Sequence, residues 1–205
     1  MINKRFDLKK LKDLLNEALE EQKKVDLGKL LDERTASKAF VAITMKNASN
    51  MWPDIKAKRM APYVRGKLVT ETDEVASLDL GLVLIALGIN QIGNLFPKEQ
   101  AERLTQYTFD ELAVDKTGYS TNEVVDYIAA LSEGKDAKDG FDNVITILLN
   151  QWFGKNTDTI MFKPISGSGV LVIDPIIKDF IFEAIALAPT FWDTIKGDYK
   201  LYENS

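Results

Sequence analysis

Residues 79–91 read DLGLVLIALGINQ, and this stretch decides the fold. From Leu80 to Ile89 no side chain is polar, which is enough apolar surface to bury a helix on most sides. A helix that crosses a bilayer needs about 20 apolar residues, so this shorter run predicts a buried core helix instead. Asp73 and Glu74 mark its start, because carboxylates are favourable at the positive end of the helix dipole. We expect the helix to continue to Leu95.

Gly81 and Gly88 lie seven residues apart in this segment. Two helical turns separate them, so both fall on nearly the same face. Missing side chains there would let another helix approach closely, at some cost in helix propensity. The pair therefore predicts a close helix–helix contact.

Helical spacing of apolar residues recurs on both sides of the central segment. It predicts a mainly α-helical bundle of about seven to nine helices in a single domain, residues 1–205, within which residues 1–67 could form a basic N-terminal subregion. The expected helices cover a stretch from near Asp7 to Leu31 with a break at Gly28, Ser37–Lys46 with an exit over Asn47–Pro53, Lys98–Ala113, a start at the capping box Ser120–Glu123, Asp142–Phe153, residues 174–187, and a short last helix from Thr190.

The stretch PISGSG, residues 164–169, is the one glycine-rich loop that resembles a motif. A phosphate-binding loop places its glycines directly before a helix N-terminus. Here the glycines precede the apolar, β-prone run Val170–Ile173. We therefore expect a turn, in a short β-hairpin or extended arm near residues 160–173.

Catalytic signatures are weak. The chain has no His and no Cys, which removes the commonest general base and the thiolate nucleophile and leaves disulfides impossible. The acids Asp110, Glu111, Asp115, Glu123 and Asp126 invite a metal hypothesis, but Gly118 and Tyr119 do not fit the spacing of a calcium loop. We predict no metal site and no cofactor. The absence of cysteine and of an apolar leader favours a cytoplasmic protein.

Charge is segregated along the chain. Residues 1–67 hold 16 Lys and Arg against 9 Asp and Glu, a net charge of +7, whereas residues 68–205 have a net charge of −12. Cations and aromatic side chains are interleaved at the end of the basic third, a mixture suited to phosphate contacts and base stacking. The predicted site consists of Lys56, Lys58, Arg59, Arg65, Lys67, Trp52 and Tyr63.

Several interpretations of this patch compete. The plainest is that the basic third packs against the acidic remainder or forms a solvated face. The second is recognition of an acidic protein or of another copy of the chain. The third is nucleic-acid binding through Lys56–Lys67, which the acidic pI of 5.0 and the absence of a nucleic-acid motif disfavour. A membrane-surface role ranks last, because the polar face of the first helix is as acidic as it is basic.

The sequence thus predicts a non-catalytic intracellular binding protein, with a regulatory or assembly role, that presents its basic N-terminal third to an acidic macromolecular partner. The alternative is a nucleic-acid-associated protein. An enzyme that depends on carboxylates and lysines comes third. The sequence does not indicate a small-molecule ligand.

Overall fold

The structure is a computed structural model. Its described residues are 30–56, 73–115, 118–153, 162–164, 171–173 and 190–203.

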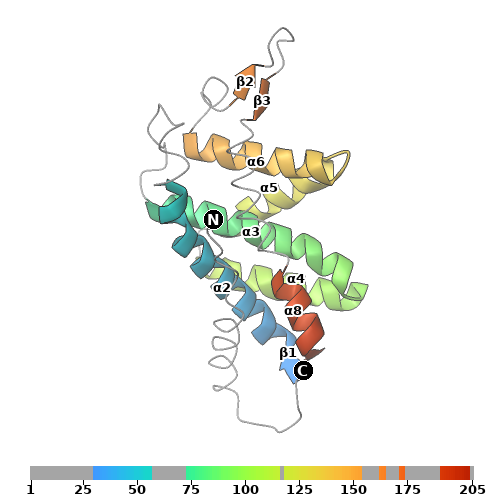
Figure 1. Ribbon diagram of the computed structural model, residues 1–205. Coiled ribbons are helices and arrows are strands. Elements are labelled where there is room, and N and C mark those ends of the chain that lie inside the picture. The colour runs from blue at the N-terminus through green and yellow to red at the C-terminus, as the bar shows by residue number, and fades with distance from the viewer. Residues whose placement is uncertain are drawn as a thin grey trace.

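The described residues confirm a mainly α-helical fold with two short strand pairs (Figure 1). They contain six α-helices, so the expected count of seven to nine for the whole chain stays a prediction. In chain order the elements are β1 Leu30–Asp32, α2 Glu33–Ile55, α3 Asp73–Leu95, α4 Lys98–Leu112, the 3₁₀ turn η2 Ala113–Asp115, α5 Tyr119–Glu133, α6 Ala137–Phe153, β2 Phe162–Pro164, β3 Leu171–Ile173, α8 Thr190–Asp198 and β4 Lys200–Tyr202.

The predicted core helix, α3, runs through the middle of the molecule. In Figure 1, α2, α4 and α8 lie on one side of it, and α5 and α6 lie on the other. Among the described helices, α3 alone is long and apolar enough to cross a membrane, but 67% of its most apolar 18-residue stretch is buried inside the protein. It serves here as the central helix of the core, and its first residue is Asp73, as the acidic first turn predicts.

Helix α2 is longer than the sequence suggested at both ends. Asp32 caps its N-terminus, because the side-chain Oδ2 accepts a hydrogen bond of 2.8 Å from the backbone N–H of Thr35. At the other end the helix passes through Pro53, where the sequence analysis placed an exit. Trp52 and Ile55 are buried, and their burial outweighs the hydrogen bond that proline removes on the exposed side.

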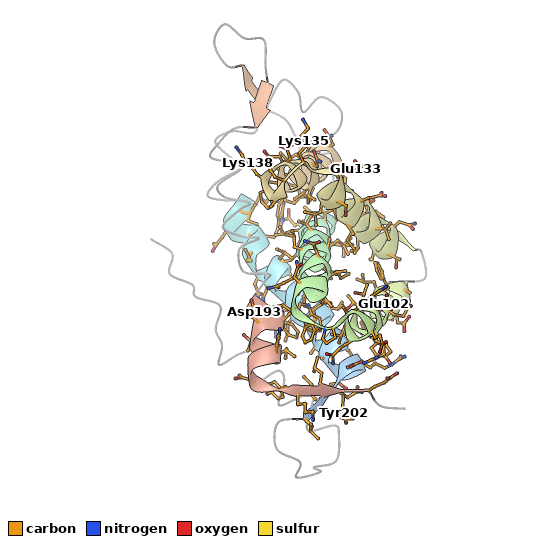
Figure 2. All side chains as sticks on the ribbon, turned by 90° about the vertical axis from the view of Figure 1, so that its right-hand side faces the viewer. Glu102, Glu133, Lys135, Lys138, Asp193 and Tyr202 are labelled. Carbon is orange, nitrogen blue, oxygen red and sulfur yellow. The ribbon has the colours of Figure 1, made fainter. Side chains whose placement is uncertain are left out.

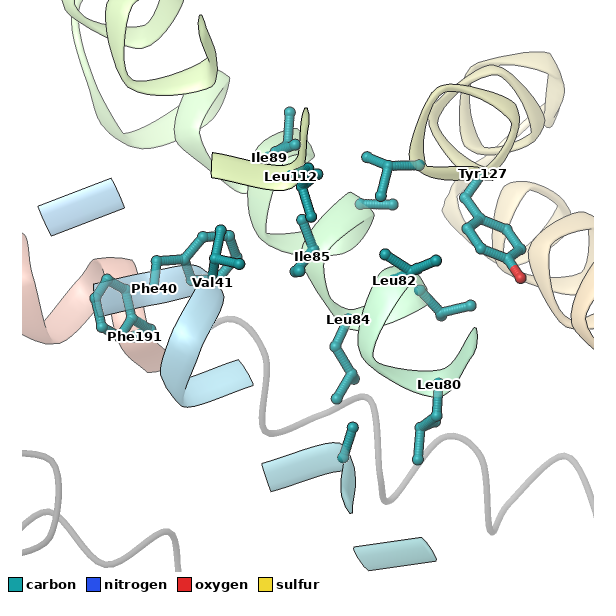
Figure 3. Packing of buried hydrophobic residues seen from close by; sticks show 14 of the residues in the cluster. Phe40, Val41, Leu80, Leu82, Leu84, Ile85, Ile89, Leu112, Tyr127 and Phe191 are labelled. Carbon is teal, nitrogen blue, oxygen red and sulfur yellow. The ribbon is translucent and has the colours of Figure 1, made fainter. Parts of the chain in front are cut away.

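The predicted glycine contact is confirmed between α2 and α3. A Cβ atom on Gly88 would overlap the ring of Phe40, and one on Gly81 would overlap the sulfur of Met45. Figure 3 shows Phe40 and Val41 on α2 facing the apolar side chains of α3. The two helices pack closely because α3 has no side chain at these two positions.

An aromatic cluster extends this contact to the last helix. The Phe40 ring centroid lies 5.3 Å from that of Phe191 and 5.1 Å from that of Trp192, both on α8. Phe96, just after α3, meets Trp192 edge-on at 5.9 Å. Lys196 of α8 donates to the carbonyl oxygen of Leu95, at the end of α3. Helix α8 is therefore held by both α2 and α3.

A buried ion pair connects α2 to α4. Glu33 is 1% exposed and accepts two hydrogen bonds from the Arg103 guanidinium, at 2.7 and 2.9 Å, and one from Gln100 at 2.8 Å. Hydrogen bonding to Arg103 is the main reason that the pKa of Glu33 lies below its usual value. The same guanidinium lies 3.5 Å from Glu203, which follows β4.

Of the two strand pairs, only the second was predicted from the sequence. β1 and β4 pair in parallel, with Leu31 opposite Leu201, although some 170 residues separate them in sequence. β2 and β3 pair antiparallel, with Phe162 opposite Ile173, as the predicted hairpin near residues 160–173 requires. The loop residues of PISGSG after Pro164 lie outside the described residues.

Two helix starts differ from the expected ones. Helix α5 begins at Tyr119, one residue before the capping box, after Gly118 in the left-handed conformation with a φ of 72°. Helix α6 begins at Ala137 and not at Asp142, because the Asp136 side chain accepts hydrogen bonds from the backbone N–H groups of Lys138 and Asp139, both at 2.9 Å. The charged segment 134–140 is thus a short turn followed by the first turn of a helix.

Substitution G88A is expected to destabilise the protein by about 1–3 kcal/mol, because the new methyl group overpacks against Phe40. G93A, in the same helix, is the matched control, since nothing lies within 4 Å of a Cβ there. It should stabilise the protein by about 0.5–1 kcal/mol through helix propensity alone. Urea unfolding of both variants measures the difference; equal effects would contradict the packing described here.

Substitution R103M removes the cation from a carboxylate that has almost no contact with water. We expect it to lower the free energy of unfolding by about 3–5 kcal/mol. R34M is the control, because Arg34 is 67% exposed and its Nη2 lies 3.7 Å from Asp110; its loss should be at most about 1 kcal/mol. A small loss for both variants in urea unfolding would show that the Glu33–Arg103 pair does not join the helices.

Candidate functional site

The exposed residues of α2, together with Lys56 directly after it, include four cations and no acid. Arg34, Lys38, Lys46 and Lys56 are exposed, whereas Glu33 is buried and Asp54 is half-buried. At about 100° per residue, the four cations fall within a sector of about 120° and span about 33 Å along the helix. We call these four residues the basic stripe.

The two ends of the basic stripe contact carboxylates of the same chain. Arg34 lies 3.7 Å from Asp110 and 4.7 Å above the Tyr107 ring centroid. The Lys56 ammonium lies 2.6 Å from Asp73, and this hydrogen bond is the main reason that the Asp73 pKa is lowered. All these charged side chains are more than 40% exposed, so the pairs contribute little to stability.

The middle of the basic stripe consists of Lys38 and Lys46. Neither lysine forms an ion pair with any residue in the part of the chain that the structure describes. Two α-helical turns and about 12 Å separate them, with the exposed Ala42 between. These two ammonium groups are the part of the stripe best placed to contact another molecule.

The structure describes two of the seven residues in the predicted patch. Lys56 is exposed and directly follows the last residue of α2. Trp52 is 2% exposed and packs edge-on against Trp152, with ring centroids 5.1 Å apart, so it is a core residue and not a surface ring for base stacking. The others lie outside the described residues: Lys58, Arg59, Tyr63, Arg65 and Lys67.

A second polar feature lies between helices α3, α5 and α6, and it was not predicted. Two neighbouring sets of hydrogen-bonded side chains from α3, α5 and α6 make up what we call the polar cluster: Asp79 with Tyr119, and Glu123 with Tyr127 and Gln151. The Tyr119 hydroxyl donates to Asp79 at 2.7 Å. The Tyr127 hydroxyl donates to Gln151, whose amide donates in turn to Glu123. Figure 3 shows the Tyr127 side chain projecting from α5 beside the leucines of α3.

Both carboxyl groups of the polar cluster have raised pKa values. Burial is the main cause for Asp79, which is 1% exposed; the Tyr119 hydroxyl and the Trp152 indole act in the opposite direction. Burial is also the main cause for Glu123, with further increases from the charges of Asp79 and Asp126. The cluster therefore favours a protonated carboxyl group inside the protein.

The chemistry that the polar cluster can perform is limited by access. Asp79 is sealed from solvent, so it can hold a proton but cannot present it to a substrate in this conformation. The acids that suggested a metal site are dispersed: Asp110 faces Arg34, and Glu123 accepts from Gln151. Within the described ranges, no three Asp or Glu side chains converge on a common point. We assign the cluster a structural role that connects α3 to α5, with Glu123 and Tyr127 joining α5 to α6.

A sequence signal for the polar cluster does exist. Tyr119, Glu123 and Tyr127 recur every four residues, which places them on one face of α5. Asp79 directly precedes the apolar run Leu80–Ile89, a position that fits the exposed edge of a buried segment as well as a buried polar group. Only the packing of α5 against α3 brings these groups together.

No family model, curated protein or solved structure matches this chain. A functional conclusion therefore depends on the two polar features themselves. Asp79 and Tyr127, the buried members of the polar cluster, are out of reach of a partner, whereas all four side chains of the basic stripe are exposed. The stripe is therefore the candidate functional site.

Substitution D79N tests the raised pKa of Asp79. Because folding raises this pKa, the folded protein binds the proton more tightly than the unfolded chain, and stability falls as pH rises from the unfolded to the folded pKa. Asparagine keeps an acceptor for the Tyr119 hydroxyl and carries no charge. D79N should therefore become more stable relative to the wild type as pH rises through that window.

Thermal unfolding between about pH 4 and pH 8 measures this difference. E102Q is the control, since Glu102 is an exposed acid on α4 and its removal should leave the pH dependence almost unchanged. A constant stability difference between D79N and wild type over the whole range would contradict the assignment.

Proposed function

We propose that this protein is a non-catalytic intracellular binding protein with a regulatory or assembly role, and that its basic N-terminal third contacts an acidic protein partner. The observation that carries the proposal is the basic stripe, in which every charged exposed side chain of α2 is a cation. Lys58, Arg59, Arg65 and Lys67 follow it in sequence and add to the same charge. The site acts by electrostatic attraction, which speeds association and selects partners of opposite charge.

The exposure of the stripe's own ion pairs supports this proposal. The Lys56–Asp73 and Arg34–Asp110 pairs are solvent-exposed, so exchanging either carboxylate for one from a partner costs little free energy. Lys38 and Lys46 form no ion pair with a described residue, so a partner carboxylate displaces none of these residues when it binds them. A partner can therefore engage the stripe without disturbing the core beneath it.

The buried position of Trp52 favours a protein partner over nucleic acid. Binding of single-stranded nucleic acid commonly depends on exposed aromatic rings that stack on bases, and Trp52 does not offer one. The stripe still suits phosphate groups, so nucleic acid is a competing outcome of the experiment below.

The double substitution K38E/K46E reverses the middle of the stripe. We expect it to weaken binding of fluorescent poly-L-glutamate by about tenfold or more, because two attractions become repulsions. The matched control is K135E/K138E, which makes the same charge change at two exposed lysines labelled in Figure 2, Lys135 in the α5–α6 turn and Lys138 in the first turn of α6. Fluorescence anisotropy at low ionic strength measures both affinities.

Equal affinities for K38E/K46E and K135E/K138E would overturn the proposal, since net charge alone would then explain binding. An oligo-dT strand serves as a parallel probe. Preference for oligo-dT over poly-L-glutamate, lost in K38E/K46E, would replace the protein partner with nucleic acid. Circular dichroism should show the same helix content in all variants, because the four lysines are exposed.

A further inference from the structure

Helix α5 carries a surface that complements the basic stripe. Within Tyr119–Glu133 there is no Lys or Arg, and Asp126 and Glu133 are exposed. At about 100° per residue these two acids lie within about 20° of each other, some 10 Å apart along the helix. The exposed Ala129 lies between them. We call Asp126, Ala129 and Glu133, with the neighbouring Val125, the acidic face.

The acidic face also exposes apolar surface that nothing in the described fold covers. Val125 is 49% exposed, although it stands in a helix whose other valine, Val124, is fully buried. A single exposed valine is unremarkable in isolation. Here it lies one turn before Ala129 and beside Asp126, so the face combines a small apolar surface with carboxylates at its edge, the composition of a small interface with a charged rim.

The two surfaces match in spacing as well as in charge. On α2, Lys38 and Lys46 flank Ala42 over about 12 Å; on α5, Asp126 and Glu133 flank Ala129 over about 10 Å. Small central residues allow two helices to approach until the flanking charges meet. The stripe and the face cannot meet within one molecule, because α2 and α5 each bury their inner side against α3 and turn these residues away from it.

We propose that the acidic partner of the basic stripe is a second copy of this chain, which docks through the acidic face of its α5. This inference rests on the proposed function, since it uses the same stripe, and it adds the identity of the partner. The contact joins two different surfaces, so it extends head to tail from copy to copy unless its rotation closes a ring. Because the opposing charges are exposed, association is weak and sensitive to salt.

Sedimentation equilibrium of the full chain tests the proposal. At a protein concentration of about 100 µM and low ionic strength, the weight-average mass should exceed 23.0 kDa, and it should return to that value in about 0.5 M NaCl. K38E/K46E alone and D126K/E133K alone should each remain monomeric, because each places like charges opposite one another. An equimolar mixture of the two should associate again, since each reversed surface then faces its complement.

The mixture distinguishes this contact from general charge effects. The variant E99K/E102K, which reverses two exposed acids on α4, is the control and should associate as the wild type does. A wild type that stays at 23.0 kDa, or a mixture that stays monomeric, would overturn self-association. In that case poly-L-glutamate binding that depends on Lys38 and Lys46 would still support an acidic partner of another kind, so the two proposals fail separately.

Discussion

The close contact between α2 and α3 is the constraint on which the remaining structure depends. Phe40 occupies the space that a side chain at position 88 would fill, and Met45 occupies the space beside position 81. Because the Phe40 ring reaches this depth, it also meets Phe191 and Trp192 and holds α8 in place. Two missing side chains on α3 thus determine where α2 lies, and α2 determines where the end of the chain docks.

This contact also explains how an acidic protein comes to expose a cation-only helix face. α2 has one buried side, and its first-turn acid, Glu33, belongs to that side, where Arg103 and Gln100 satisfy it. The remaining acid, Asp54, lies outside the sector of the basic stripe. Rotation of α2 about its axis would bring Glu33 to the surface, but the fit of Phe40 against Gly88 fixes the rotation. Core packing therefore sets the charge of the exposed face.

The features that could be predicted are those that depend on the residue pattern within one helix. The apolar run after Asp79 and the glycines at 81 and 88 predicted α3 and its close neighbour. The spacing of apolar residues also predicted α4, with its end one residue from the observed one. The β1–β4 pair could not be predicted, because three-residue strands have no measurable period and their partners lie at opposite ends of the chain. The polar cluster and the burial of Trp52 likewise depend on tertiary contacts between helices. The segregation of charge was visible in the sequence. That the cations share one face of α2 could be seen only once the bounds of that helix were known.

The difference in burial between the ion pairs decides which of them can take part in recognition. Glu33 has lost its water, so separating it from Arg103 leaves an uncompensated charge, and this pair behaves as part of the core. Asp73 and Lys56 remain hydrated when apart, so their separation costs almost nothing. A partner carboxylate can replace Asp73 or Asp110 but cannot compete for Arg103. The same helix therefore combines a rigid inner side with an outer side whose contacts can be exchanged, and recognition by charge requires this combination.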